Sequence, residues 1–238
     1  MDCVKYWRIA ALTVLLLAAV SIPSHSFGWR DGFTGFPPQL KDGVYPRQYR
    51  PDRTVDFDHL RLELKIFMNE KRVEGTARYD FRPIHDQVKS IRFDAMRMDI
   101  AAVTSPSQPS LKWTYSENTV YVEFPAPLPM DATTSLAIAY SVKPPQSTPA
   151  GMDTGMFFTD SKHVVAENPD QLFTLNEPFG GSYWFPCADY PNDRMTTEMA
   201  VTVPKELVTL SNGLLVDSRE DGEWRTDLWK QKIPHAVY

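Results

Sequence analysis

Residues 60–81, LRLELKIFMNEKRVEGTARYDF, consist of two alternating segments around a short polar turn. Apolar side chains occupy every second position from Leu60 to Ile66, and the same period returns from Val73 to Phe81. A period of two is that of a β-strand with one buried face. Asn69–Lys71 carries the turn signal, and Pro83 ends the second segment because proline cannot donate to a strand ladder. The stretch therefore predicts a β-hairpin.

The same pattern recurs along the chain, and no helical period longer than a turn or two appears. Twenty prolines and eleven glycines also favour many short elements over long helices. Further strands are expected over residues 88–93, 98–104, 111–115, 119–124, 135–142, 156–158, 198–203, 208–210, 214–216 and 224–230. Short strands at this spacing predict an all-β protein, specifically an antiparallel β-sandwich.

Length and composition are those of a folded domain. The 238 residues are 42% apolar, which is enough for a packed core. The formal charge of -5 and the lack of a basic patch argue against nucleic acid as a partner.

We divide the chain into residues 1–26, an irregular Gly- and Pro-rich lead-in over 27–53, and a β-domain over 54–238. The last residues, 231–238, predict the start of another strand, which suits a fragment of a longer reading frame.

The first 26 residues have the pattern of a signal peptide. Lys5 and Arg8 precede an apolar run from Ile9 to Ile22, which is shorter than the roughly 20 residues that a spanning helix needs. Small residues in Ser24–Ser26 fit a cut before Phe27. The alternative is an uncleaved N-terminal anchor. Both interpretations predict an exported protein that is periplasmic, secreted or tethered to a membrane.

Residues for metal or nucleophilic chemistry are sparse. None of the five histidines falls in an H-E-x-x-H pattern, the helix-borne zinc pair of metallopeptidases. Cys3 lies in the predicted signal peptide, which leaves Cys187 alone and excludes a disulfide framework within the chain. A lone cysteine among aromatic residues is most often a small buried side chain. We therefore expect no catalytic residue and no metal site in this chain.

The most informative stretch runs from residue 173 to 213. It contains an acidic loop at 176–178, an aromatic segment at 183–187 that we expect to be a strand, and a polar turn at 188–194. Glu177 in the acidic loop is the candidate binding residue, because a carboxylate can hold the free α-ammonium group of a peptide through charge-assisted hydrogen bonds. The alternative is an ordinary solvated loop carboxylate.

Three motifs in this stretch carry a family resemblance. They are T-L-N-E-P at 174–178, Y-W-F-P-C-A-D-Y-P at 183–191 and S-N-G at 211–213. The chain resembles the N-terminal β-domain of M1-family zinc aminopeptidases, the aminopeptidase N-like group, over roughly Val55 to Tyr238. That family has T-Q-x-E-P, R-x-W-F-P-C-x-D-x-P and S-N-G. Leu175 stands at the Gln position and cannot form its hydrogen bonds, and Ser182 stands at the Arg position.

The resemblance implies a role for Glu177 at the substrate's N-terminus, with Leu175 and Asn176 as candidate neighbours. It implies the N-terminal, substrate-end-binding domain of an exported M1-type zinc metallo-aminopeptidase. The zinc would lie in a missing catalytic domain that packs against this one, so the chain alone should be inactive. The remaining matches, Tyr183, Trp184, Phe185 and Cys187, are expected in the core, and Asp189 is expected to cap the turn at 190–193.

A second hypothesis from a different class stays open. The chain could be a non-catalytic, exported β-sandwich binding module that derives from such a domain and contacts a protein or a glycan. Fold alone does not separate the two hypotheses. A continuation of the frame into H-E-x-x-H would favour the peptidase.

Overall fold

The computed structural model of the chain describes residues 52–108, 110–144, 154–159, 170–177 and 179–238. Within these residues the chain forms twelve strands and one short 3₁₀ turn, and no α-helix. The elements are β1 (Val55–Phe67), β2 (Arg72–Pro83), β3 (Val88–Asp94), β4 (Met98–Thr104), β5 (Lys112–Ser116), β6 (Thr119–Leu128), β7 (Thr134–Val142), β8 (Gly155–Thr159), β9 (Gln171–Leu175), η1 (Gly181–Tyr183), β10 (Met195–Pro204), β11 (Leu214–Asp221) and β12 (Trp224–His235). The described residues contain no helix of the length and apolarity that a membrane span requires.

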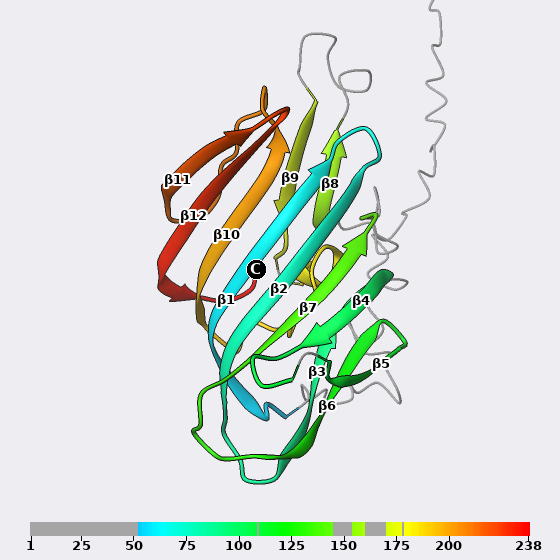
Figure 1. Cartoon of the computed structure of the whole chain (residues 1–238), viewed down its shortest axis with the longest axis vertical. Helices are drawn as coiled ribbons and strands as arrows, with labels where there is room; N and C mark the ends of the chain where they lie inside the picture. The colour runs from blue at the N-terminus through cyan, green and yellow to red at the C-terminus, as the bar shows by residue number, and fades with distance from the viewer. Residues whose placement is uncertain (1–51, 109, 145–153, 160–169, 178) are drawn as a thin grey trace, which may run out of the picture.

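The strands form one large and two small sheets (Figure 1). The large sheet has the order β11-β12-β10-β1-β2-β7-β4, the second has the order β3-β6-β5, and β8 and β9 form a separate hairpin. The predicted all-β sandwich is confirmed. One neighbouring pair, β1 with β10, is parallel, so the large sheet is mixed. The alternation of side chains predicts strands but not the direction in which distant strands pair.

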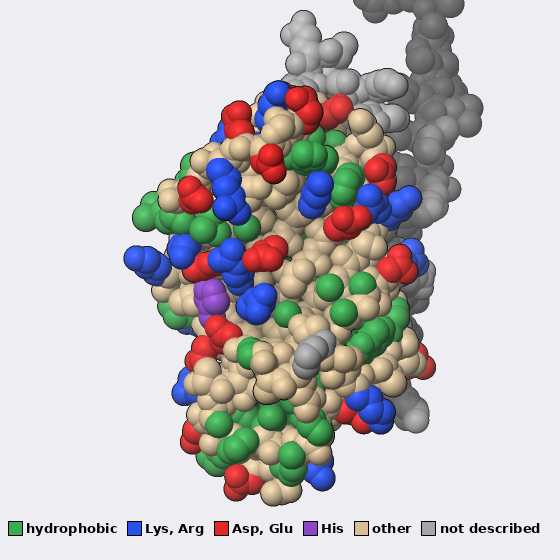
Figure 2. All heavy atoms as spheres, viewed as in Figure 1, with side chains coloured by type: hydrophobic (Ala, Val, Ile, Leu, Met, Phe, Trp, Pro, Cys, Tyr) green, Lys and Arg blue, Asp and Glu red, His purple; other side chains and the backbone are tan. Residues whose placement is uncertain are grey.

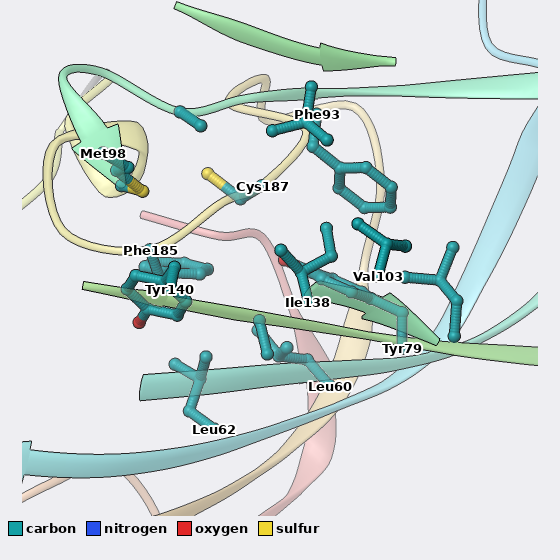
Figure 3. Close-up of a cluster of buried hydrophobic side chains, with 14 of the residues drawn as sticks. Leu60, Leu62, Tyr79, Phe93, Met98, Val103, Ile138, Tyr140, Phe185 and Cys187 are labelled. Carbon is teal, nitrogen blue, oxygen red and sulfur yellow. The ribbon is translucent and has the colours of Figure 1, made fainter. Parts of the chain in front are cut away.

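The core lies between the large sheet and the smaller elements. The alternating residues of the β1–β2 hairpin, such as Leu62 and Tyr79, point into it, as do Phe93 of β3 and Val122 of β6. Figure 3 shows Cys187 and Phe185 among side chains from these strands. Each fully buried side chain of this size contributes about 1.5–3 kcal/mol relative to an exposed one. Burial of these alternating side chains therefore fixes the register of the first hairpin.

The expected aromatic strand at 183–187 was wrong. Residues 181–183 form the 3₁₀ turn η1, and the backbone N–H groups of Trp184 and Phe185 both donate to the carbonyl oxygen of Gly181 at 3.0 Å. Trp184, Phe185 and Cys187 are buried as predicted, whereas Tyr183 is half-buried. Consecutive buried residues do not show the alternation of a strand with one wet face, and here they mark a packed turn.

Two other strand predictions were wrong. Residues 208–210 form a loop, in which Val208 and Leu210 are 83% and 90% exposed and Thr209 is partly buried. The Thr209 hydroxyl donates to Asp227 at 2.6 Å and accepts from the Trp229 indole at 2.9 Å. Residues 231–235 continue β12 instead of starting a new strand. The predicted signal peptide, most of the lead-in and residues 145–153 lie outside the described residues.

Candidate functional site

The β8–β9 hairpin positions Glu177. Met156 and Phe158 of β8 belong to the core and anchor the hairpin to the body of the protein. After β9 ends at Leu175, Asn176 is buried and Glu177 is exposed. The candidate carboxylate therefore projects from the first turn after an anchored strand.

Asn176 fixes the loop from below. Its Oδ1 accepts a hydrogen bond from the Trp184 indole Nε1 at 3.0 Å, and both side chains are buried. Loss of either partner would leave a buried polar group unpaired, which costs about 1–3 kcal/mol of stability. This bond therefore holds the backbone next to Glu177 in one place. Asn176, a candidate neighbour of the site, thus contacts the interior and not the solvent.

Asp189 is the second anchor of the same loop. Its carboxylate accepts from the backbone N–H groups of Gly180 and Ser182 at 3.3 and 3.1 Å, and from the Ser182 hydroxyl at 2.7 Å. Burial raises the pKa of Asp189, and these hydrogen bonds partly offset that rise. The sequence predicted that Asp189 would cap the turn at 190–193, but the structure shows that it reaches back to 180–182. Ser182, at the position where the M1 pattern has Arg, supplies a hydroxyl to this buried carboxylate.

The loop packs too closely against the hairpin for any side chain at Gly180. A Cβ there would lie 2.8 Å from the Asn176 Cα and 2.9 Å from the Gly155 backbone nitrogen. The Thr154 Cβ lies 3.1 Å from the same position, and the buried Thr154 hydroxyl has no hydrogen-bond partner among the described residues. The backbone around Glu177 is therefore held by close packing as well as by hydrogen bonds.

Leu175 lies on the exposed side of the site. It is 49% exposed, and Phe173, two residues earlier on β9, is 48% exposed. Sequence reasoning singled out Leu175 and noted Ser182 and Asp189, but it predicted neither the exposure of Phe173 nor the bond between Ser182 and Asp189. The alternation of Phe173, Leu175 and Glu177 was the available signal for the first, and no local pattern indicated the Ser182–Asp189 bond.

The described residues do not fit a zinc ion. No group of three or more His, Cys, Asp or Glu side chains in the described part of the chain is arranged to hold a metal. Cys187 is fully buried, and burial raises the pKa of its thiol well above the ordinary value. A thiol in that state is a poor nucleophile and a poor metal ligand.

A broad hollow of about 680 Å³ lies on the outer face of the large sheet, away from the core. Figure 2 shows this face, where acidic and basic side chains gather over β1 and β10. Glu198 pairs with Arg61 at 2.6 Å and with Lys230 at 2.7 Å. The volume is within the range of ligand sites. These charges, however, are bound to one another, and such partly exposed pairs contribute little each.

Comparisons with known proteins bear on this geometry. Residues 46–238 match the family model of the Peptidase M1 N-terminal domain. A crystal structure of an M1 zinc metallopeptidase mutant from Deinococcus radiodurans, bound to a Tyr-Ser-Ala substrate, has 24% sequence identity and a TM-score of 0.68, and the match covers 78% of this chain. A two-domain M1 zinc metallopeptidase mutant bound to L-arginine has 23% identity and a TM-score of 0.68 over 79% of this chain. In both cases the chain spans 41% of the other protein's length.

Proposed function

The chain belongs to the M1 peptidase N-terminal domain family, and on that premise we propose that it is the substrate-end-binding domain of an exported zinc metallo-aminopeptidase. The observation that carries the proposal is the exposed Glu177 carboxylate on a loop anchored by Asn176 and Asp189. An exposed carboxylate on an anchored backbone suits recognition of a cation, and the α-ammonium group of a peptide is such a cation.

In this proposal Glu177 supplies binding and not chemistry. Its oxygens accept hydrogen bonds from the substrate's α-ammonium group, which sets the position of the first peptide bond and favours peptides with a free N-terminus. The rigid loop lowers the ordering cost of binding, because little conformational freedom remains to be lost. Zinc-activated water in a separate catalytic domain would hydrolyse the bond, so the chain alone should be inactive.

The supporting comparison is one of architecture. The similar structures are M1 zinc metallopeptidases, one of them bound to a tripeptide substrate, and this chain spans 41% of their length. The proposal therefore places the zinc and the catalytic residues in a part of the protein that packs against this domain. Export rests on the predicted signal peptide over residues 1–26.

The first experiment determines the nucleotide sequence that follows the Tyr238 codon. A frame that continues into an H-E-x-x-H motif supports the peptidase. A stop codon at that point rules it out and favours the alternative, a non-catalytic exported binding module. In that case, the hollow on the outer face of the large sheet is the candidate site for a ligand.

Kinetics of the full-length protein test the role of Glu177. Glu177→Ala should raise KM for substrates with a free N-terminus about tenfold or more, since a hydrogen bond to a charged group contributes about 1.5–3 kcal/mol. Glu206→Ala, which removes an exposed carboxylate from the β10–β11 loop, is the matched control and should leave KM unchanged. An unchanged kcat/KM in Glu177→Ala would remove Glu177 from the site.

A further inference from the structure

The hollow on the outer face of the large sheet is lined by a row of directly paired residues, one from each of the seven strands. Directly paired residues share a face of a sheet. This is the face that Figure 2 shows, since the neighbours of Lys65 along β1, Leu64 and Ile66, belong to the core. From β11 to β4 the row is Arg219, Thr226, Thr202, Lys65, Glu74, Ser141 and Asp99. We name these seven residues the outer row.

The Lys65 side chain leans along the outer row toward β12. Its ammonium nitrogen lies 4.1 Å from the centroid of the Trp224 ring on β12, although Lys65 is on β1 and β10 lies between the two strands. The centroid of the Phe67 ring is 5.4 Å from the same nitrogen. Cation–π attraction to both rings favours this placement. The ammonium group is therefore held next to Thr226, which follows Trp224 by two residues on the same face.

Two threonine hydroxyls lie between Lys65 and Arg219 in the outer row. The Thr202 and Thr226 Oγ1 atoms are 2.9 Å apart, so one hydroxyl donates to the other. The accepting hydroxyl keeps its own hydrogen for a further bond. Neighbouring strands are about 4.8 Å apart, so the exposed Arg219 on β11 starts one strand away from Thr226. An ammonium group, a hydroxyl donor and a guanidinium group can thus reach one ligand group.

The charge of Lys65 is not neutralised by an ion pair with any described residue. The carboxylates next to it on this face, Glu63 and Glu74, form ion pairs with Arg61 and Arg72. Because those carboxylates already have their own cations, the ammonium group of Lys65 is available to an anion from outside the protein.

Arg219 also lacks an ion pair among the described residues. Asp217 and Asp221 lie two residues away from it on β11, but neither of them lines the hollow. At this end, the residues that line the hollow are therefore two cations and two hydroxyls, which together suit an anion.

The other end of the outer row carries polar groups without partners. The Thr76 and Ser141 hydroxyls and the Asp99 carboxylate line the hollow and form no side-chain hydrogen bond within the described part of the chain. The small side chains of Ala139 and Ala200 lie between the two ends. Six strand spacings make the row about 29 Å long, which is far more than one inorganic ion occupies. Free hydroxyls and a free carboxylate suit the hydroxyl groups of a larger ligand.

We propose that the outer row binds a sugar phosphate or a sugar sulfate. The oxyanion lies over Thr202 and Thr226, between the Lys65 ammonium and Arg219 guanidinium groups. A tetrahedral oxyanion offers acceptor oxygens to donors from several strands at once, and the arginine fork matches its geometry. The sugar hydroxyls extend toward Ser141 and Asp99. This inference goes beyond the proposed function and does not depend on Glu177.

Isothermal titration calorimetry of the purified protein at constant ionic strength tests the proposal. The ligands are glucose-6-phosphate, glucose-6-sulfate, inorganic phosphate, inorganic sulfate and glucose. At least one ester should bind saturably and more tightly than its inorganic ion, and glucose should bind more weakly than that ester. The ester that binds more tightly identifies the source of the oxyanion. Esters that bind no better than the inorganic ions would overturn the assignment of a sugar.

Substitutions within the outer row locate the site. Lys65→Gln and Arg219→Gln should each raise Kd for the ester about tenfold or more, because each removes a hydrogen bond to a charged group. Ser141→Ala should raise Kd for the ester about threefold and leave Kd for the inorganic ion unchanged. The control Lys89→Gln removes the same charge from an exposed position on β3, in another sheet, and should leave Kd unchanged. Far-UV circular dichroism checks that each variant is folded.

Three results would overturn the proposal. They are the absence of saturable binding of either ester, Kd values in Lys65→Gln and Arg219→Gln equal to that of the wild type, and equal weakening in Lys89→Gln, which would indicate attraction to net charge alone. None of these results bears on Glu177. Glu177→Ala should bind the esters as the wild type does, so failure of this proposal leaves the proposed function intact.

Discussion

Two buried tyrosines of the large sheet should respond in opposite directions to the same substitution. Tyr79 and Tyr140 are 0% and 3% exposed. The Tyr79 hydroxyl donates to the carbonyl oxygen of Pro186 at 2.6 Å, whereas the Tyr140 hydroxyl has no hydrogen-bond partner among the described residues. Tyr140→Phe should therefore stabilise the protein, and Tyr79→Phe should destabilise it.

The magnitudes follow from the cost of burying an unpaired polar group. That cost is about 1–3 kcal/mol, and Tyr140→Phe removes it. The Tyr140 ring packs directly over Gly75, where an added Cβ would lie 2.7 Å from the Tyr140 Cζ. The phenylalanine ring keeps this packing, so little contact is lost. Tyr79→Phe loses a bond and leaves a buried carbonyl unpaired, which should cost about 1–3 kcal/mol. The two variants should thus differ by about 2 kcal/mol or more in the free energy of unfolding.

Urea unfolding at 25 °C, followed by far-UV circular dichroism, measures both changes by linear extrapolation. In thermal unfolding, each 1 kcal/mol should shift Tm by about 2–4 °C for a chain of this size. Equal m-values in the three proteins would show that the substitutions change stability without changing the surface exposed on unfolding. A Tyr140→Phe variant less stable than the wild type would refute the reasoning, as would equal shifts of the two variants in the same direction.

Three further predictions use other parts of the fold. Asn176→Ala leaves the buried Trp184 indole N–H unpaired and should lower the free energy of unfolding, measured by urea titration, by about 1–3 kcal/mol. The control Asn69→Ala, at an exposed position, should change it by less than about 0.5 kcal/mol. Burial raises the pKa of Asp189 in the folded state, so the native protein binds its proton more tightly than the unfolded chain. Stability of the wild type relative to Asp189→Asn should then fall as pH rises above the ordinary Asp pKa, and a flat difference between pH 4 and pH 7 would contradict this. Gly213 has φ = +89°, and a Cβ there would lie 2.0 Å from a backbone oxygen of β12, whereas Gly222 has φ = +61° and open space around it. Gly213→Ala should therefore lower Tm far more than Gly222→Ala. Similar Tm values for the two variants would argue against this backbone constraint.

Much of the fold could be predicted from local pattern. Alternation identified the β1–β2 hairpin and most strands, because a strand with one buried face repeats every two residues whatever its partners are. The pattern failed at residues 183–187, where successive side chains are all at least half-buried in a turn, and at 208–210, where the inward-facing residue is a threonine held by Asp227. In both places, side-chain contacts with distant residues decide the backbone, and local sequence does not contain them.

The candidate site divides in the same way. Glu177 could be singled out from the sequence because a carboxylate next to proline, between apolar segments, is an unusual local feature, and the T-L-N-E-P motif resembles a family pattern. The anchors beneath it could not be predicted. The partners of Asn176 and Asp189 depend on how the loop folds back on itself, with no repeated spacing that would reveal them.

By itself, the sequence determined the all-β class, the strand segments and the acidic loop, since each depends on residues that are neighbours in the chain. Only the tertiary structure decided the parallel pairing of β1 with β10, where His59 meets Thr196 across 137 positions. It also decided that β8 is buried while most of β9, its partner in the hairpin, stays exposed. Both outcomes result from the competition among all apolar surfaces for one core, and that competition is settled by long-range packing.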